Sequence, residues 1–264
     1  MNIFKRELKA NLRSLLIWGG VVVLFIILGV SKFSAYYNNP DMLSFLNSLP
    51  EAMLKILNTQ AFNLTTVTGF FGIMFTYFAL LLSIAAAMWG SDIIAKEQRD
   101  KTVEFSLTLP VTRSRVVFSK TFAALVNCVG LLLITWGVSI GSAQPYQPDA
   151  EFYRFLALSM LALFIMQLVF LSIGVLLGCV MKRYKMASSA SLFLLLGTYF
   201  LSVIITLNRS LDFLKFLSPF TYFDPAVLLH DSSINLGFVG LSIVIVAVSL
   251  IAARMVYEKR DLYI

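Results

Sequence analysis

Residues 155–180 read FLALSMLALFIMQLVFLSIGVLLGCV, an unbroken run without a charged side chain. An α-helix rises about 1.5 Å per residue, so about 20 apolar residues cross the roughly 30 Å hydrocarbon core of a bilayer. The run is long enough for that crossing and is predicted to form a transmembrane helix. Because it does not alternate apolar with polar residues, it is not a strand of a membrane β-barrel.

Five further apolar segments have the same character. They cover residues of about 15–33, 69–90, 121–140, 186–207 and 236–256. Their apolar cores, which begin with 15–30, contain no Asp, Glu, Lys, Arg or His except Arg254, whose long side chain can reach the interface from near the end of the last segment. The first segment also fits a signal peptide, but no small-residue cleavage site follows it and five more spans do. We therefore predict an all-α polytopic membrane protein with six transmembrane helices, forming a single domain over 1–264.

The composition supports this class. Hydrophobic residues make up 59% of the chain and charged residues 13%, with a mean hydropathy of +0.84. Soluble proteins are about 45–50% apolar and about 25% charged, so soluble, disordered and collagen-like classes are excluded. Two cysteines do not make a disulfide scaffold, and a lone histidine, His230, leaves little material for a histidine-based metal site.

Lysine and arginine indicate the orientation in the membrane. With six spans, 16 of the 21 basic residues fall on the side that carries both termini. Basic residues concentrate on the cytoplasmic side of membrane proteins, so both termini are predicted to be cytoplasmic. The net charge of +7 therefore indicates topology and contact with membrane lipid, and does not point to nucleic acid.

Two segments outside the spans have unusual patterns. In residues 2–13, apolar and basic side chains separate onto two faces of a helix, which predicts an interfacial helix at the N-terminus; the alternative is the basic flank of the first span. Residues 211–229 are rich in aromatic side chains and contain Pro219 and Pro225. A re-entrant or interface-lying hairpin and an aromatic belt both fit this segment.

The cytoplasmic connection over 91–120 is long and densely charged. A Glu97–Lys101 pair four residues apart favours a short helix, which Pro110 would end. A docking surface and a solvated loop are both consistent with this pattern.

No nucleotide-binding or hydrolytic motif occurs in the chain. The phosphate-cradling pattern G-x-x-x-x-G-K-[ST] is absent, as are G-x-G-x-x-G and H-E-x-x-H, so no catalytic residue is assigned. The spans carry only mildly polar groups, which form hydrogen bonds between helices or line a substrate path. The strongest candidates are Thr76, Tyr77, Asn127, Gln167, Thr198 and Tyr199. Ion-coupled carriers place ionisable residues near the membrane midplane, and none is found there.

Residues 97–120, EQRDKTVEFSLTLPVTRSRVVFSK, resemble the connection between the second and third spans of type-2 ABC exporter permeases, the ABC-2 family. In that family the pattern is a glutamate, a spacer, Gly-Thr, a short apolar helix, Pro-Val, a basic residue and a lysine at the next span; this chain has Lys101 where the family commonly has the glycine. Residues 216–225, FLSPFTYFDP, resemble the family's segment before the last span. With the six spans, the resemblance covers the whole chain.

The resemblance implies a permease subunit that is not itself an enzyme. Two copies would form a homodimer, each docking a separate ATP-binding subunit that holds ATP and magnesium, with no cofactor in this chain. The coupling contact to that ATPase would involve Glu97, Thr102, Glu104, Leu107, Pro110 and Arg113. The expected function is export of an amphipathic or hydrophobic substrate, such as a peptide, a drug or a lipid-like molecule, across a bacterial plasma membrane. The alternative is an ion-coupled secondary transporter or channel.

Overall fold

The computed structural model describes residues 3–39, 50, 62–99, 112–181 and 183–259. Among these residues no β-strand occurs, and six helices are long and apolar enough to cross a membrane. They are α1 (Ile3–Phe33), α4 (Val67–Arg99), α6 (Arg113–Ala143), α7 (Ala150–Val180), α8 (Tyr184–Leu207) and α10 (Leu236–Lys259). Short helices connect them: η1 (Gln144–Tyr146), η2 (Arg209–Leu217), η3 (Pro219–Thr221) and α9 (Pro225–His230). The predicted all-helical class with six spans is confirmed.

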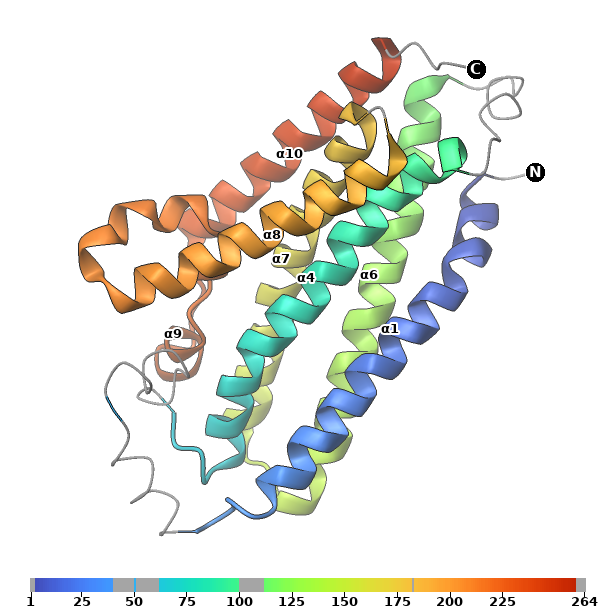
Figure 1. Ribbon diagram of the computed structural model, residues 1–264. Helices are drawn as coiled ribbons and strands as arrows, with labels where there is room; N and C mark the ends of the chain where they lie inside the picture. Colours follow the sequence, from blue (N-terminus) through green and yellow to red (C-terminus); the bar gives the residue numbers. More distant parts are fainter. Residues whose placement is uncertain (1–2, 40–49, 51–61, 100–111, 182, 260–264) are drawn as a thin grey trace.

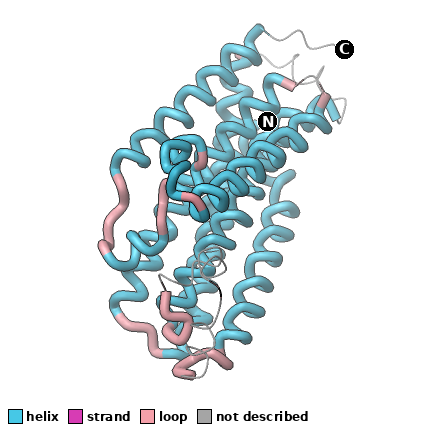
Figure 2. Tube along the Cα trace, turned by 60° about the vertical axis from the view of Figure 1, so that its left-hand side comes forward, coloured by secondary structure: helices cyan, strands magenta, loops and turns pink. Residues whose placement is uncertain are grey.

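The long helices run side by side in one bundle (Figures 1 and 2). Ile3 of α1 and Lys259 of α10 lie at the same end, which we call the terminal end (Figure 1). The end of α4 and the start of α6, which flank residues 100–111, also lie at the terminal end.

Helices α4 and α7 form the centre of the bundle. Buried residues make up 67% of the most apolar stretch of α4 and 61% of that of α7, against 17% for α1, α8 and α10. The outer helices therefore present apolar faces outward, as lipid or a partner subunit requires.

Glycines allow α4 and α7 to approach closely. A Cβ added to Gly174 would lie 2.5 Å from the backbone oxygen of Ala87, and one added to Gly178 would lie 2.8 Å from that of Ser91. Gly90 of α4 lies opposite these two glycines in the same contact between α4 and α7. The G-x-x-x-G pattern of α7 thus has the packing role that small residues have between membrane helices.

The N-terminal segment is continuous with the first span. Residues 2–13 are predicted to form an interfacial helix or the basic flank of that span, and α1 runs without a break from Ile3 to Phe33. No glycine or proline precedes Gly19, so nothing in the sequence ends the helix before the span. The basic, amphipathic stretch is therefore the first part of the helix that also contains the span.

The aromatic segment after α8 folds back along that helix. Ser218 Oγ donates a hydrogen bond of 2.7 Å to the backbone oxygen of Thr198, about two and a half turns before α8 ends. The ring of Phe220 lies 5.4 Å from that of Tyr199 and 5.3 Å from that of Phe170. Such contacts favour a returning hairpin over an extended aromatic belt.

Candidate functional site

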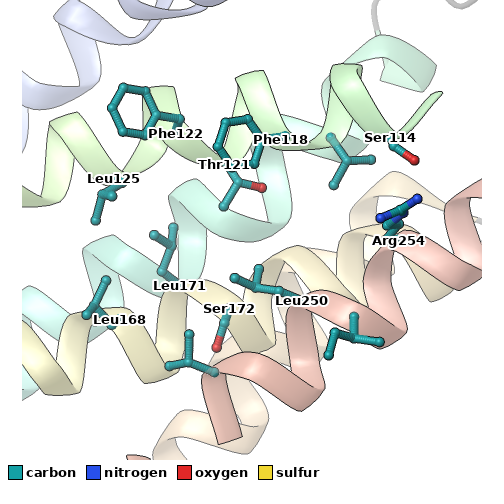
Figure 3. A pocket seen from close by; sticks show the side chains of 13 residues that line it. Ser114, Phe118, Thr121, Phe122, Leu125, Leu168, Leu171, Ser172, Leu250 and Arg254 are labelled. Atoms are coloured by element: carbon teal, nitrogen blue, oxygen red, sulfur yellow. The ribbon is translucent and has the colours of Figure 1, made fainter. Parts of the chain in front are cut away.

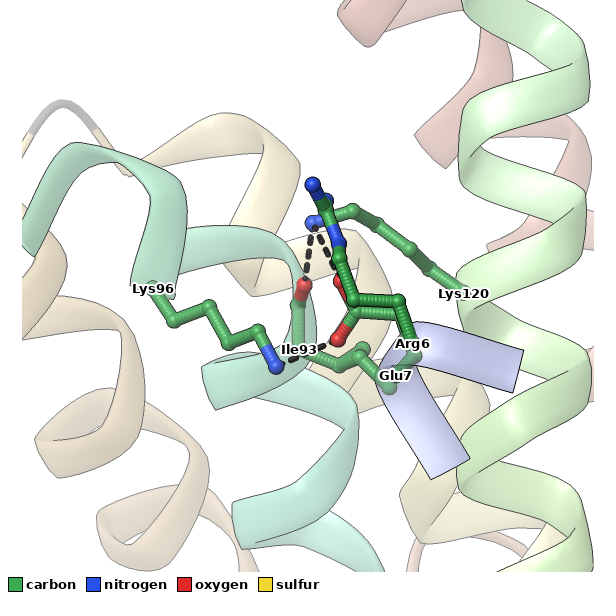
Figure 4. Close-up of polar contacts among 5 residues, drawn as sticks. All are labelled: Arg6, Glu7, Ile93, Lys96 and Lys120. Carbon is green, nitrogen blue, oxygen red and sulfur yellow. Dashed lines mark hydrogen bonds and ion pairs between the residues drawn. The ribbon is translucent and has the colours of Figure 1, made fainter. Parts of the chain in front are cut away.

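A buried carboxylate lies at the terminal end of the bundle. The side chain of Glu7 is 1% exposed and forms an ion pair with Lys96. Its Oε1 lies 3.8 Å from Lys120 Nζ and 3.4 Å from a guanidinium nitrogen of Arg6. Lys120 Nζ also donates a hydrogen bond of 2.9 Å to the backbone oxygen of Ile93 (Figure 4). We call Arg6, Glu7, Lys96 and Lys120 the Glu7 cluster.

The Glu7 cluster joins three helices where the segment 100–112 is attached. Glu7 belongs to α1, Lys96 to the last turn of α4, and Lys120 to the start of α6. The side chain of Lys120 is also 1% exposed. The carboxylate of Glu7 and the ammonium group of Lys120 are therefore both shielded from water. An isolated charge at such a position would be strongly destabilising, which makes the pairing a requirement of the fold. Glu7 therefore links α1 to both helices, α4 and α6, that flank residues 100–111.

Glu7 was not singled out in the sequence, although one signal pointed to it. It is the only acidic residue in α1. At about 100° per residue it falls about 60° from Phe4, on the apolar side of the helix and away from the basic face. An acid on an apolar face needs a buried partner, and the two lysines supply it.

Most residues expected in the ATPase contact fall outside the described part of the chain. Thr102, Glu104, Leu107 and Pro110 lie in 100–111, and only the backbone of Glu97, in the last turn of α4, is described.

Arg113, the first residue of α6, is described. Its Nη1 donates a hydrogen bond of 3.2 Å to the backbone oxygen of Glu258. Thr112 caps the same helix by accepting a hydrogen bond from the backbone N–H of Arg115. The start of α6 is thus fixed to the end of α10.

A cavity of about 500 Å³ opens between α4 and α8 at the end of the bundle opposite the termini. Thr76 and Phe75 line it from α4, Tyr199 and Thr206 from α8, and Lys215 from η2. Aromatic and charged side chains therefore meet in one hollow, as a site for an amphipathic molecule requires. Of the six polar candidates, the structure brings Thr76 and Tyr199 together here.

The other four candidates do not share that cavity. Tyr77 packs against Phe25 with 5.7 Å between the ring centres, and Thr198 Oγ1 donates to the backbone oxygen of Leu195. Asn127 and Gln167 are buried in α6 and α7, and among the described residues neither Asn127 Nδ2 nor the amide atoms of Gln167 have a hydrogen-bond partner. Gln167 is the more notable, because both amide atoms lack a bond in an apolar core.

The bundle defines a polytopic helical membrane protein, and its described residues include no group of three or more His, Cys, Asp or Glu side chains that could hold a metal ion. A family model described as ABC-2 family transporter protein matches residues 1–262. The chain therefore belongs to the ABC-2 transporter family, as the resemblance of residues 97–120 indicated, and is a membrane permease subunit of an ABC transporter. A comparison with curated proteins gave no match.

Proposed function

We propose that the chain is the permease of an ATP-driven exporter and that a separate ATP-binding subunit docks on the connection between α4 and α6. The Glu7 cluster carries this proposal, because it ties both ends of that connection to α1. The terminal end then faces the cytoplasm, in agreement with the distribution of basic residues.

In this mechanism the ATPases push the connection when they close on ATP. The movement of the connection is transmitted directly to α4 and α6, and it is transmitted to α1 through the carboxylate of Glu7. A buried ion pair suits this role, because separating it in a low-dielectric surrounding is costly, so the three helix ends move as one body. Glu97, Thr102, Glu104, Leu107, Pro110 and Arg113 are proposed to form or support the contact with the ATPase.

The cavity between α4 and α8 is the proposed exit for substrate. Its aromatic side chains offer apolar surface, while Asp212, Lys215 and Asp224 offer charge. An amphipathic or hydrophobic peptide, drug or lipid-like molecule has the matching chemistry. A second copy of the permease would complete the pathway, and the sparsely buried α1, α8 and α10 leave faces for it.

The test is the Glu97→Ala substitution in the permease reconstituted with its ATP-binding subunit in proteoliposomes. We expect a stable complex whose ATP hydrolysis falls well below the wild-type rate, because the contact that couples the subunits is lost. Glu151→Ala, at an exposed carboxylate of α7 on the opposite end, is the matched control. Wild-type hydrolysis in Glu97→Ala would contradict the proposed contact, and transport driven by an ion gradient without ATP would indicate a carrier.

A further inference from the structure

A second cavity, of about 330 Å³, lies between α6, α7 and α10 (Figure 3). Leu125 of α6, Leu168 and Leu171 of α7, and Val246 and Leu250 of α10 line it. None of its lining residues belongs to the proposed exit cavity between α4 and α8. We call this second cavity the lateral groove.

The lateral groove is apolar and open to the side. Phe118 at its rim is 73% exposed and Ile251 is 60% exposed. In a membrane these side chains face hydrocarbon, so a chain of methylene groups can enter from the bilayer and fill the space between the helices. One polar atom on the wall is unused: Thr121 Oγ1 is buried and has no hydrogen-bond partner among the described residues.

One end of the lateral groove is basic. Arg254 and Ser114 line it there, at the terminal end of the bundle (Figure 3). Arg254 donates from Nε to Glu258 Oε1 at 3.0 Å, and its two terminal nitrogens make no hydrogen bond or ion pair with any described residue. The exposed Arg115 and Lys259 lie near the same helix ends, so Glu258 is outnumbered by cations there.

We propose that the lateral groove binds an anionic phospholipid of the leaflet at the terminal end, which is the cytoplasmic leaflet in the orientation given above. An acyl chain lies along the leucines, and the ester region reaches Thr121. The phosphate meets the terminal nitrogens of Arg254. The argument rests on charge complementarity, because a groove apolar along its length and basic at its membrane–water end matches an acyl chain joined to a negative headgroup.

The experiment is native mass spectrometry of the full-length wild-type chain with equal amounts of phosphatidylglycerol and phosphatidylcholine carrying the same acyl chains. We expect the chain to retain about tenfold more phosphatidylglycerol than phosphatidylcholine. One or two basic side chains near a single negative headgroup give a preference of about this size. Arg254→Gln should retain lipid but lose that preference. Arg154→Gln, at an exposed arginine on the opposite end of α7, is the matched control and should behave as wild type.

A second variant tests the acyl chain's place separately from the charge. Thr121→Phe puts a ring into the lateral groove and should abolish retention of both lipids, while size-exclusion chromatography reports whether the chain is folded. Should that variant not fold, Arg254→Gln still decides the proposal.

Three results would overturn the proposal. The first is equal retention of the two lipids by the wild type, which means ordinary surrounding lipid. The second is displacement of the bound lipid by glycerol phosphate alone, which means a site for a free phosphate compound. The third is a disulfide-linked dimer of Ile251→Cys with Cys128 and Cys179 replaced by alanine, which means that a second copy covers the groove.

Discussion

Replacing Glu7 with glutamine removes the charge that holds the terminal end of the bundle together while keeping the shape of the side chain. In the wild type the carboxylate pairs with Lys96 and Lys120, and the side chain of Lys120 is 1% exposed. The glutamine leaves that ammonium group buried but takes away the negative charge of residue 7. We therefore expect Glu7→Gln to be strongly destabilising.

The size of the effect follows from the geometry. At the 3.8 Å between Glu7 Oε1 and Lys120 Nζ, an effective dielectric constant of about 20 gives an attraction of about 4 kcal/mol. Removing one partner of a buried ion pair costs about 3–5 kcal/mol, mostly because the other charge stays buried. For a chain of this size the loss corresponds to a fall in melting temperature on the order of 10 °C.

Thermal unfolding of the purified chain in detergent, followed by the loss of monodisperse protein, measures this shift. The double variant Glu7→Leu/Lys120→Met removes both of the fully buried charges and should melt well above Glu7→Gln, because only the more exposed Lys96 and Arg6 then lose the carboxylate. Glu151→Gln, an exposed carboxylate at the start of α7, should melt within a degree or so of wild type.

Two results would refute the reasoning. If Glu7→Gln melted like wild type, the carboxylate would not be an essential partner of the lysines. If the double variant melted below Glu7→Gln, the loss would come from packing and not from the unpaired charge.

Three further predictions follow from the same structure. Gly174→Leu should prevent accumulation of the folded chain, because the new side chain would meet the backbone of α4. Gly137→Leu is the control and should accumulate normally in membranes, because open space surrounds a Cβ added at that position. Equal amounts of the two variants by immunoblot would contradict the packing of α4 against α7. In intact cells an impermeant thiol reagent should label Glu151→Cys but not Lys185→Cys, in a background without native cysteines, and the reverse pattern would invert the orientation. Tyr199→Ala should lower substrate-stimulated ATP hydrolysis of the reconstituted complex several-fold while leaving basal hydrolysis intact, and unchanged stimulation would exclude the cavity between α4 and α8 as the exit.

The six long helices could be predicted because hydrophobicity and length decide them. A run such as 155–180 has no alternative stable structure in a bilayer, where every backbone hydrogen bond must be made within the helix. The separation of a span from an amphipathic extension is a weaker signal. The pattern of residues 2–13 predicted an interfacial helix or the basic flank of the first span, and α1 is continuous through both segments because no glycine or proline intervenes.

The candidate site was less predictable, because it depends on contacts between distant residues. Thr76 and Tyr199 were both recognised as polar groups in spans, but nothing in their spacing shows that α4 and α8 place them in one cavity. The Glu7 cluster likewise joins residues from three helices. From the sequence alone, the positive charges of Lys96 and Lys120 are explained equally well by the excess of basic residues on one side of the membrane. Only the fold shows that Glu7 lies between them.

The central claim is that a separate ATP-binding subunit drives this permease, and one measurement tests it most directly. The tagged full-length chain is purified from native membranes, and ATP hydrolysis is measured in the complex and again after the chain has been stripped of its partners. The account predicts a co-purifying protein with a phosphate-binding loop, hydrolysis in the complex, and none from the chain alone, which lacks that motif. Hydrolysis by the stripped chain, or purification without an ATP-binding partner, would contradict it.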